Sequence, residues 1–228
     1  MPIKTGLSRL DSLLKNGIPE KSSILVLGPP KSGKTLIGLH FLFEGLQNNE
    51  YGVYVVTNNF PEDVMKRFEN IGNVDDSLQN GMLKVVDCYT MYTGVQKGNT
   101  LFIIRVSGPT ALTEIGIAFT EITKKIPKNS KVRVIFDSVS TLLLFNAPKT
   151  VETFVQSMNG KIKWFGGTSM FILEEGMHDQ KDVTTINSLL DALLHLKKEA
   201  EEREIEINGF GVDETVKYSI VNGKIICR

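Results

Sequence analysis

The sequence predicts an α/β fold in which a mostly parallel, twisted sheet is flanked by helices and extended at one edge by antiparallel strands. Between residues 23 and 190, short apolar runs alternate with stretches whose apolar residues recur every three or four positions, as in strands followed by amphipathic helices. From residue 192 onward, apolar and polar residues alternate around two Asn-Gly dipeptides, which are strong hairpin signals. The length of 228 residues suits a single domain over residues 1–228.

Five apolar runs are the expected parallel strands: residues 23–28, 52–57, 82–86, 132–136 and 169–173. The expected helices each carry apolar residues on one face: the stretch from residue 36 to about 46, and residues 61–71, 110–125, 149–163 and 185–190. A polar connection surrounds residues 93–100. Strands separated by helices of this length pair in parallel through right-handed crossovers.

The C-terminal part is expected to form antiparallel strands at residues 192–197, 204–208, 215–221 and 224–227. Asn208-Gly209 and Asn222-Gly223 are the expected turns, because this dipeptide adopts the left-handed conformations that two-residue hairpin loops require. Residues 197–206 carry charges of both signs, and we expect an exposed connector there.

Composition excludes several classes of protein. Lys plus Arg and Asp plus Glu both total 26, so the whole molecule has no net attraction to nucleic acid or to an anionic membrane. Cys88 and Cys227 form no CxxC pair, which argues against a structural zinc site and favours a reducing, cytoplasmic location. We read neither a signal sequence nor a segment near the roughly 20 apolar residues that span a bilayer.

One motif predicts a phosphate site. It matches the pattern GxxxxGK[ST] and stands between an expected strand and an expected helix, as its chemistry requires; its residues are Gly28, Pro29, Pro30, Lys31, Ser32, Gly33, Lys34 and Thr35. Backbone N–H groups of such a loop surround a polyphosphate, and Lys34 places a positive charge on its β and γ phosphates. Thr35 is the expected ligand of Mg²⁺.

A carboxylate at the end of a neighbouring strand would support that metal ion. Asp137 follows the apolar run 132–136 and is the candidate. The alternative is that Asp137 caps a following helix, a role that also suits Ser138 and Ser140. The two roles are compatible.

These motifs resemble the KaiC-like branch of the RecA-superfamily P-loop ATPases. The resemblance covers nearly the whole chain: residues 5–11 and 17–19 resemble the family's opening TGxxxLDxLLxxGIP, and it continues through the phosphate loop, residues 36–45, 52–56, 61–62, 112–114, 137–140 and 176–179. It implies a RecA-like domain that binds ATP or ADP with Mg²⁺ and that assembles with other copies or with a KaiC-like partner protein.

The sequence departs from this family where catalysis is expected. Family members carry two glutamates after the second strand, one of which polarises the attacking water, whereas this chain has Asn58 and Asn59. An amide orients water but accepts no proton, so hydrolysis is expected to be slow or absent. The family's Lys and Arg pair near the C-terminal hairpin also has no counterpart in residues 208–213.

Three functions remain open from the sequence. The first is a slow or non-hydrolysing ATP-binding module that acts in regulation or assembly. The second is an active ATPase with a relocated base; exposed acidic positions offer four candidates, namely Glu62, Asp63, Glu174 and Glu175. The third is a nucleic-acid-associated recombinase paralogue, which the zero net charge disfavours.

Two smaller features have ordinary explanations. His178 is expected to be a loop histidine without a switching role. The cationic cluster at residues 124–133 lacks interleaved aromatic residues and is expected to be a solvated surface; its members are Lys124, Lys125, Lys128, Lys131 and Arg133.

Overall fold

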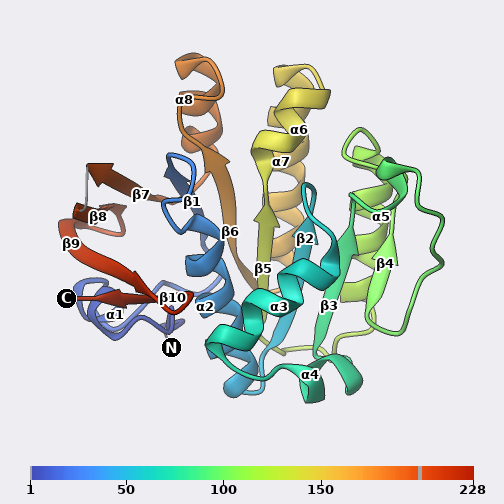
Figure 1. The fold of residues 1–228 in the computed structure, drawn as a ribbon, viewed down its shortest axis with the longest axis horizontal. Coiled ribbons are helices and arrows are strands. Elements are labelled where there is room, and N and C mark those ends of the chain that lie inside the picture. The colour runs from blue at the N-terminus through green and yellow to red at the C-terminus, as the bar shows by residue number, and fades with distance from the viewer. Residues whose placement is uncertain (1, 200–201) are drawn as a thin grey trace.

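A computed structural model describes residues 2–199 and 202–228, and its strands form a sheet in the order β10-β9-β8-β7-β1-β6-β5-β2-β3-β4 (Figure 1). The strands are β1 (Ser23–Gly28), β2 (Tyr51–Val56), β3 (Leu83–Asp87), β4 (Ile103–Arg105), β5 (Val132–Asp137), β6 (Gly167–Glu174), β7 (Ala192–Glu199), β8 (Glu202–Gly209), β9 (Val212–Val221) and β10 (Lys224–Cys227). From β7 to β4 neighbouring strands are parallel, and from β7 to β10 they are antiparallel. The predicted α/β class is therefore confirmed.

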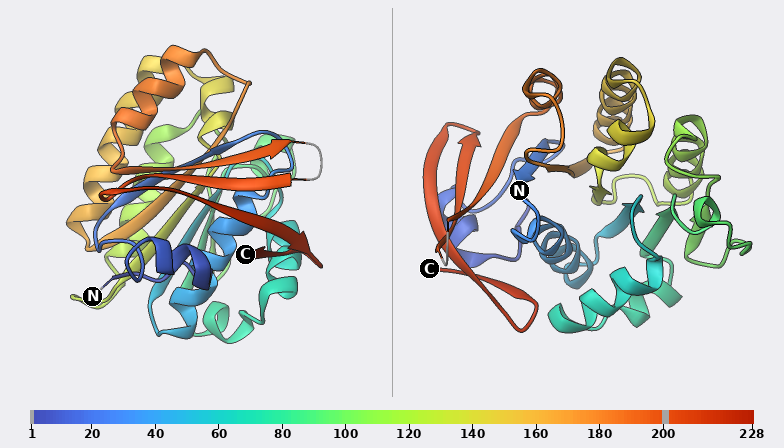
Figure 2. Two further views of the ribbon diagram at one scale, coloured as in Figure 1. Left: turned by 90° about the vertical axis from the view of Figure 1, so that its left-hand side faces the viewer. Right: turned by 45° about the horizontal axis from the view of Figure 1, so that its top comes forward.

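Helices cover both faces of the parallel region, which is why its strands are apolar along their whole length. On one face, α1 to α4 enclose a core that includes Phe41 and Phe68; on the other, α5 to α8 enclose a core that includes Phe119 and Phe171 (Figures 1 and 2). The helices are α1 (Ser8–Leu13), α2 (Lys34–Gln47), α3 (Pro61–Ile71), α4 (Asp75–Gln79), α5 (Leu112–Thr123), α6 (Val139–Phe145), α7 (Pro148–Trp164) and α8 (Gln180–Ser188), with a 3₁₀ turn η1 (Met91–Thr93).

The antiparallel edge corrects one predicted turn. The Asn222-Gly223 turn is confirmed, with both residues at positive φ between paired strand ends. Asn208-Gly209, by contrast, lies within β8, and the turn consists of Phe210-Gly211, again with both residues at positive φ. Gly209 has a packing role, because a Cβ there would lie 2.5 Å from the Cβ of Ala192.

Other boundaries also differ from the expectation. Residues 197–206 are not a connector: β7 runs to Glu199 and β8 starts at Glu202, while residues 200 and 201 lie outside the described part of the chain. The last predicted helix begins at Gln180 instead of residue 185, because only Val183 and Ile186 of its turns are buried and the apolar signal is weak. Short elements such as β4 and α4 have too few apolar residues for a periodic signal.

No helix among residues 2–199 and 202–228 has the length and hydropathy of a bilayer-spanning segment.

Candidate functional site

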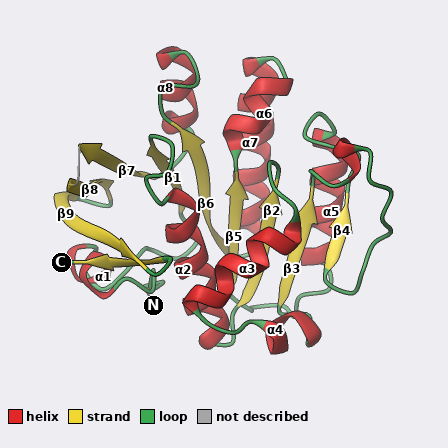
Figure 3. Ribbon diagram, viewed as in Figure 1, coloured by secondary structure: helices red, strands yellow, loops and turns green. Residues whose placement is uncertain are grey.

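The phosphate loop connects β1 to α2 at the carboxyl ends of the parallel strands (Figure 3). Glycine is required at both ends of this loop. Gly33, the residue before α2, has a φ of 104°, which other residues rarely adopt. A Cβ at Gly28 would lie 2.6 Å from the carbonyl oxygen of Leu196, so the loop packs tightly against β7.

Lys34 is buried and points back into this loop. Its Nζ donates to the carbonyl oxygens of Gly28 at 2.8 Å and Pro29 at 2.7 Å. It also lies 2.9 Å from Oε2 of Glu174, the last residue of β6 and the register partner of Gly28. The Lys34 ammonium, which is expected to bind the phosphates, thus contacts three oxygen atoms of the protein.

Thr35 and Asp137 are brought together although they lie 102 positions apart. Thr35 Oγ1 donates to Oδ2 of Asp137 at 2.8 Å, and the buried Tyr54 hydroxyl donates to the same oxygen at 2.5 Å. The cap of α6 is Ser138, whose side chain accepts from the backbone N–H of Thr141. Asp137 therefore faces the phosphate loop instead of capping this helix.

Burial dominates the electrostatics of Asp137. It raises the pKa of this carboxyl group, whereas the two hydroxyl hydrogen bonds and the positive charges of Arg67 and Lys34 lower it. Burial likewise raises the pKa of Tyr54 well above its ordinary value, so this hydroxyl remains a donor at neutral pH. A cation beside Asp137 would compensate its desolvation.

The chemistry of these groups fits a Mg-nucleotide. Ser32 Oγ is fully buried and has no hydrogen-bond partner among the described residues, so a donor for an anion is available inside the loop. The N-terminus of the 14-residue helix α2 follows directly and adds its dipole. Thr35 and Asp137 supply the oxygen atoms that Mg²⁺ prefers.

Asn58 and Asn59 follow β2 and Thr57 at the same edge of the sheet, and Asn59 Nδ2 donates to Asn58 Oδ1 at 2.7 Å. Among the four alternative carboxylate groups, that of Glu174 contacts the phosphate loop, whereas Glu175 contacts it through its backbone N–H, which donates to the carbonyl oxygen of Gly28 at 2.9 Å. A cavity of about 280 Å³ lies beyond the carboxyl ends of β2, β5 and β6, and both Asn58 and Glu174 line it.

The other three acidic candidates are paired elsewhere. Glu62 binds Lys97 at 3.1 Å, and Asp63 lies 3.5 Å from Lys66 one helical turn away. Glu175 contacts His195 at 2.9 Å.

The C-terminal strands hold the phosphate loop from outside. The Tyr218 hydroxyl on β9 donates to the carbonyl oxygen of Ser32 at 2.5 Å, and the Arg203 guanidinium on β8 donates to that of Lys31 at 3.2 Å. Sequence reasoning missed both residues and also Tyr54. No local signal marks them, since each contact joins residues more than 80 positions apart.

The cationic cluster needs one correction. Arg133 is not on a solvated surface, because only 2% of it is exposed. Its Nε lies 2.6 Å from Oε2 of Glu50, and its guanidinium also donates to the carbonyl oxygens of Lys4 and Phe41. Gly45 provides the space, since a Cβ there would lie 2.3 Å from Arg133 Nε.

His178 lies between β6 and α8, and its Nε2 is buried without a partner among the described residues. Burial lowers its pKa, with Asp182 and Glu174 opposing the shift. A neutral loop histidine is consistent with these surroundings.

A parallel sheet with a GxxxxGK[ST] loop between its first strand and the following helix is the arrangement of P-loop nucleotide-binding proteins. The chain matches the family model described as the KaiC ATPase over residues 3–216, and it belongs to this family. The resemblance inferred from the motifs is thereby confirmed.

Two curated relatives and one solved structure illustrate the match. The UPF0273 protein of Thermotoga maritima is 30% identical over 172 residues, which cover 75% of this chain and 68% of the relative. The UPF0273 protein of Pyrococcus horikoshii is 30% identical over 171 residues, with 75% and 67% covered. A KaiC-like protein of Pyrococcus horikoshii OT3 superposes with a TM-score of 0.77 at 16% identity, covering 100% of this chain and 99% of the other, which shows a shared fold.

Proposed function

We propose that this nucleotide-binding protein is an ATP-dependent module that hydrolyses ATP slowly or not at all and acts through nucleotide-dependent contacts with other copies or with a partner protein. One observation carries the proposal. The groups that bind phosphate and metal are complete at Lys34, Thr35 and Asp137, whereas the position of the family's catalytic glutamates holds Asn58 and Asn59.

Each group has a defined role in this proposal. The loop N–H groups and Lys34 hold the β and γ phosphates, and ATP must draw Lys34 away from Glu174 to do so. Thr35 and Asp137 would hold Mg²⁺, which neutralises phosphate charge when it is bound. The Tyr54 hydroxyl fixes the orientation of Asp137 before any ligand arrives.

The expected defect lies in the chemical step. Asn58 and Asn59 offer amide groups to a water molecule but take no proton from it. Loss of a general base lowers a rate by about 10²–10⁴. Loss of a cation supplied by a neighbour removes a further factor, about 10³–10⁵ where arginine fingers operate. Binding energy is retained because neither group is needed to hold the phosphates.

A single-turnover measurement with radiolabelled ATP, paired with an equilibrium binding titration, tests this function. We expect saturable, Mg-dependent ATP binding together with a hydrolysis rate far below about 1 per second, the lower end of ordinary enzyme rates. Absence of binding would refute the nucleotide site, and binding with rapid turnover would refute the slow module.

A second candidate function is an active ATPase that uses Glu174 as its base. The specific observation in its favour is that Glu174 both contacts Lys34 and lines the cavity that Asn58 also lines. In that case Glu174→Gln abolishes single turnover while ATP still binds. Under the first proposal the same substitution leaves the already slow rate within a few-fold.

A further inference from the structure

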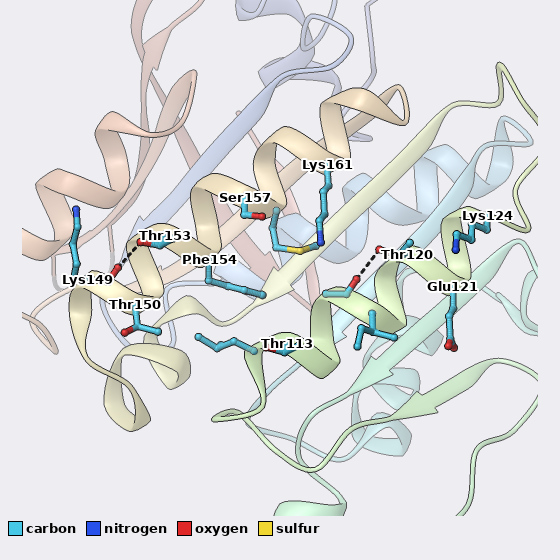
Figure 4. Close-up of a pocket in the computed structure, with 14 residues that line it drawn as sticks. Thr113, Thr120, Glu121, Lys124, Lys149, Thr150, Thr153, Phe154, Ser157 and Lys161 are labelled. Carbon is cyan, nitrogen blue, oxygen red and sulfur yellow. Dashed lines mark hydrogen bonds between the residues drawn. The ribbon is translucent and has the colours of Figure 1, made fainter.

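A groove of about 780 Å³ lies between α5 and α7, on the face of the sheet opposite α2 (Figure 4). Neither helix fills it, and Figure 4 shows side chains of both helices directed into it. Its lining residues are Leu112, Thr113, Gly116, Ile117, Thr120, Glu121, Lys124, Lys149, Thr150, Thr153, Phe154, Ser157, Met158 and Lys161. The nucleotide site plays no part in this surface.

The walls of the groove are two helical stripes. On α5 the lining residues recur every three or four positions from Thr113 to Lys124, and on α7 from Thr150 to Lys161. Twelve residues of helix extend about 18 Å, so the two walls run side by side over about three turns. A third helix laid between them would meet a continuous wall on each side.

The floor of the groove is apolar and open in its middle. Ile117 is 54% exposed, and Phe154 is partly buried against the core below. Gly116 has no side chain, and the Lys161 ammonium lies 3.5 Å from the point that a Cβ there would occupy. The long lysine side chain is therefore the only group near this point, and it is free to move aside.

The lining of the groove is cationic. Lys124, Lys149 and Lys161 line it against a single carboxylate, that of Glu121. Lys149 is paired with Glu152 at 3.1 Å, whereas Lys124 and Lys161 form no ion pair with any described residue. A segment that buries apolar side chains here gains most if it carries acidic residues beside them.

Trp164 extends the α7 stripe one turn beyond Lys161, because three positions separate them on this helix. It is the only tryptophan in the chain, and it is 86% exposed. Lys124 also lines the adjoining cavity that contains Trp164 and Phe165. The fold thus places Trp164 and Phe165 near Lys124, which has no aromatic residue within four positions in the sequence. Such combinations of an exposed tryptophan and cations are typical of binding surfaces.

We propose that the groove between α5 and α7 binds an acidic amphipathic helix of a partner protein. Apolar residues of that helix occupy the floor around Ile117, and its carboxylates pair with Lys124 and Lys161. A second copy of this chain does not offer such a helix in its described part. α3, the described helix with the most carboxylates, and α5, whose carboxylates have no basic residue beside them on the helix, both bury their main apolar face in their own core.

The single tryptophan makes the test direct. The probe is a tryptophan-free synthetic peptide of roughly 16 residues, about four helical turns, with leucines on one face and glutamates beside them. Titration into the intact protein should shift Trp164 emission to shorter wavelength and saturate. A peptide of the same composition, scrambled so that its leucines share no face, should bind at least about tenfold more weakly.

Charge-reversal variants distinguish specific docking from non-specific binding. Lys124→Glu with Lys161→Glu should weaken binding of the amphipathic peptide at least about tenfold, whereas Lys66→Glu on the opposite face should leave it unchanged. ATP binding by all variants reports that each is folded, independently of the outcome at the groove. Equal peptide affinity of wild type and the double variant overturns the proposal.

Three further outcomes also overturn it. These are no emission change at millimolar peptide, a larger response to a thymidine oligonucleotide or to phosphatidylglycerol vesicles than to the peptide, and a shift that follows protein concentration alone. The last result would indicate self-association through this face.

Discussion

Lys34 and Glu174 form an ion pair of 2.9 Å at the phosphate loop, with the lysine almost fully buried and the glutamate about one fifth exposed. The pair joins the first residue of α2 to the last residue of β6, and it places a carboxylate against the cation that phosphate binding requires. An incoming polyphosphate and this carboxylate compete for the same positive charge.

Glu174→Gln is therefore expected to tighten Mg-ATP binding, by roughly tenfold, because a negative charge near the phosphates is removed while Lys34 is retained. Lys34→Ala should abolish or severely weaken binding in a folded protein. Isothermal titration calorimetry of the two variants measures both effects. Weaker binding by Glu174→Gln would show that the carboxylate supports the ligand instead of competing with it.

Asp137→Asn should weaken binding of Mg-ATP more than binding of metal-free ATP, because the substitution removes a carboxylate that supports the metal and leaves the loop intact. The comparison requires titrations with Mg²⁺ and with EDTA. Tyr54→Phe is the matched variant: it removes only one hydrogen bond to the same oxygen, so a smaller loss in the same direction is expected. Equal losses with and without metal would make Asp137 a structural residue.

Asn58→Glu combined with Asn59→Glu should raise ATP turnover about tenfold or more with little change in affinity, because a base acts on the attacking water in the transition state. The gain should stay below the full range for a restored base, since the C-terminal hairpin supplies no cation to a neighbour. Single-turnover hydrolysis by wild type and variant provides the comparison. Wild-type turnover of about 1 per second or faster would mean that another carboxylate is catalytic.

Arg133→Met should destabilise the fold by about 3–5 kcal/mol, because it leaves the Glu50 carboxylate buried without its partner. Adding Glu50→Gln should recover part of that loss. Lys131 lies two positions before Arg133, is partly exposed and pairs with Glu20 at 2.9 Å. Lys131→Met should therefore lower the free energy of unfolding by less than about 1 kcal/mol. Urea unfolding of the three variants tests the difference, and similar losses for Arg133 and Lys131 would contradict it.

The buried position of His40 predicts that the folded protein loses stability at acidic pH. Its Nε2 accepts a hydrogen bond from the backbone N–H of Ile225 at 3.1 Å, so it is neutral in the fold, and burial lowers its pKa from 6.5 to about 4. The folded state then binds fewer protons than the unfolded state, and stability present above pH 6.5 is lost as pH falls toward 4, by at most about 3 kcal/mol.

Thermal unfolding between pH 4 and pH 7 measures this slope. His40→Gln should flatten it. An unchanged slope in His40→Gln would assign acid sensitivity to other groups.

Local patterns were sufficient for part of this molecule. The phosphate loop is encoded in eight consecutive residues, and helix α3 was predicted at its observed bounds because Val64, Phe68 and Ile71 mark one face. The pairing of Asp137 with Thr35 also follows from parallel strands that end at one edge. Local patterns could not predict contacts between distant positions: Tyr54 lies 83 positions from Asp137 in the sequence, and Tyr218 lies 186 positions from Ser32. Arg133 was misjudged because it was grouped with the lysines at residues 124–131 that precede its strand, while its partners come from other elements.

The contacts that Tyr218 and Arg203 make with the phosphate loop have a consequence for biosynthesis. The loop is complete in the nascent chain after residue 35, but Tyr218 on β9, whose hydroxyl donates to Ser32, follows that residue by 186 positions. β1 can pair with its two neighbours in the sheet only after β6 and β7 have been translated. A chain that stalls before β8 therefore carries the whole nucleotide motif without the strands that shape it, and the loop is first held in place once β8 and β9 have been made.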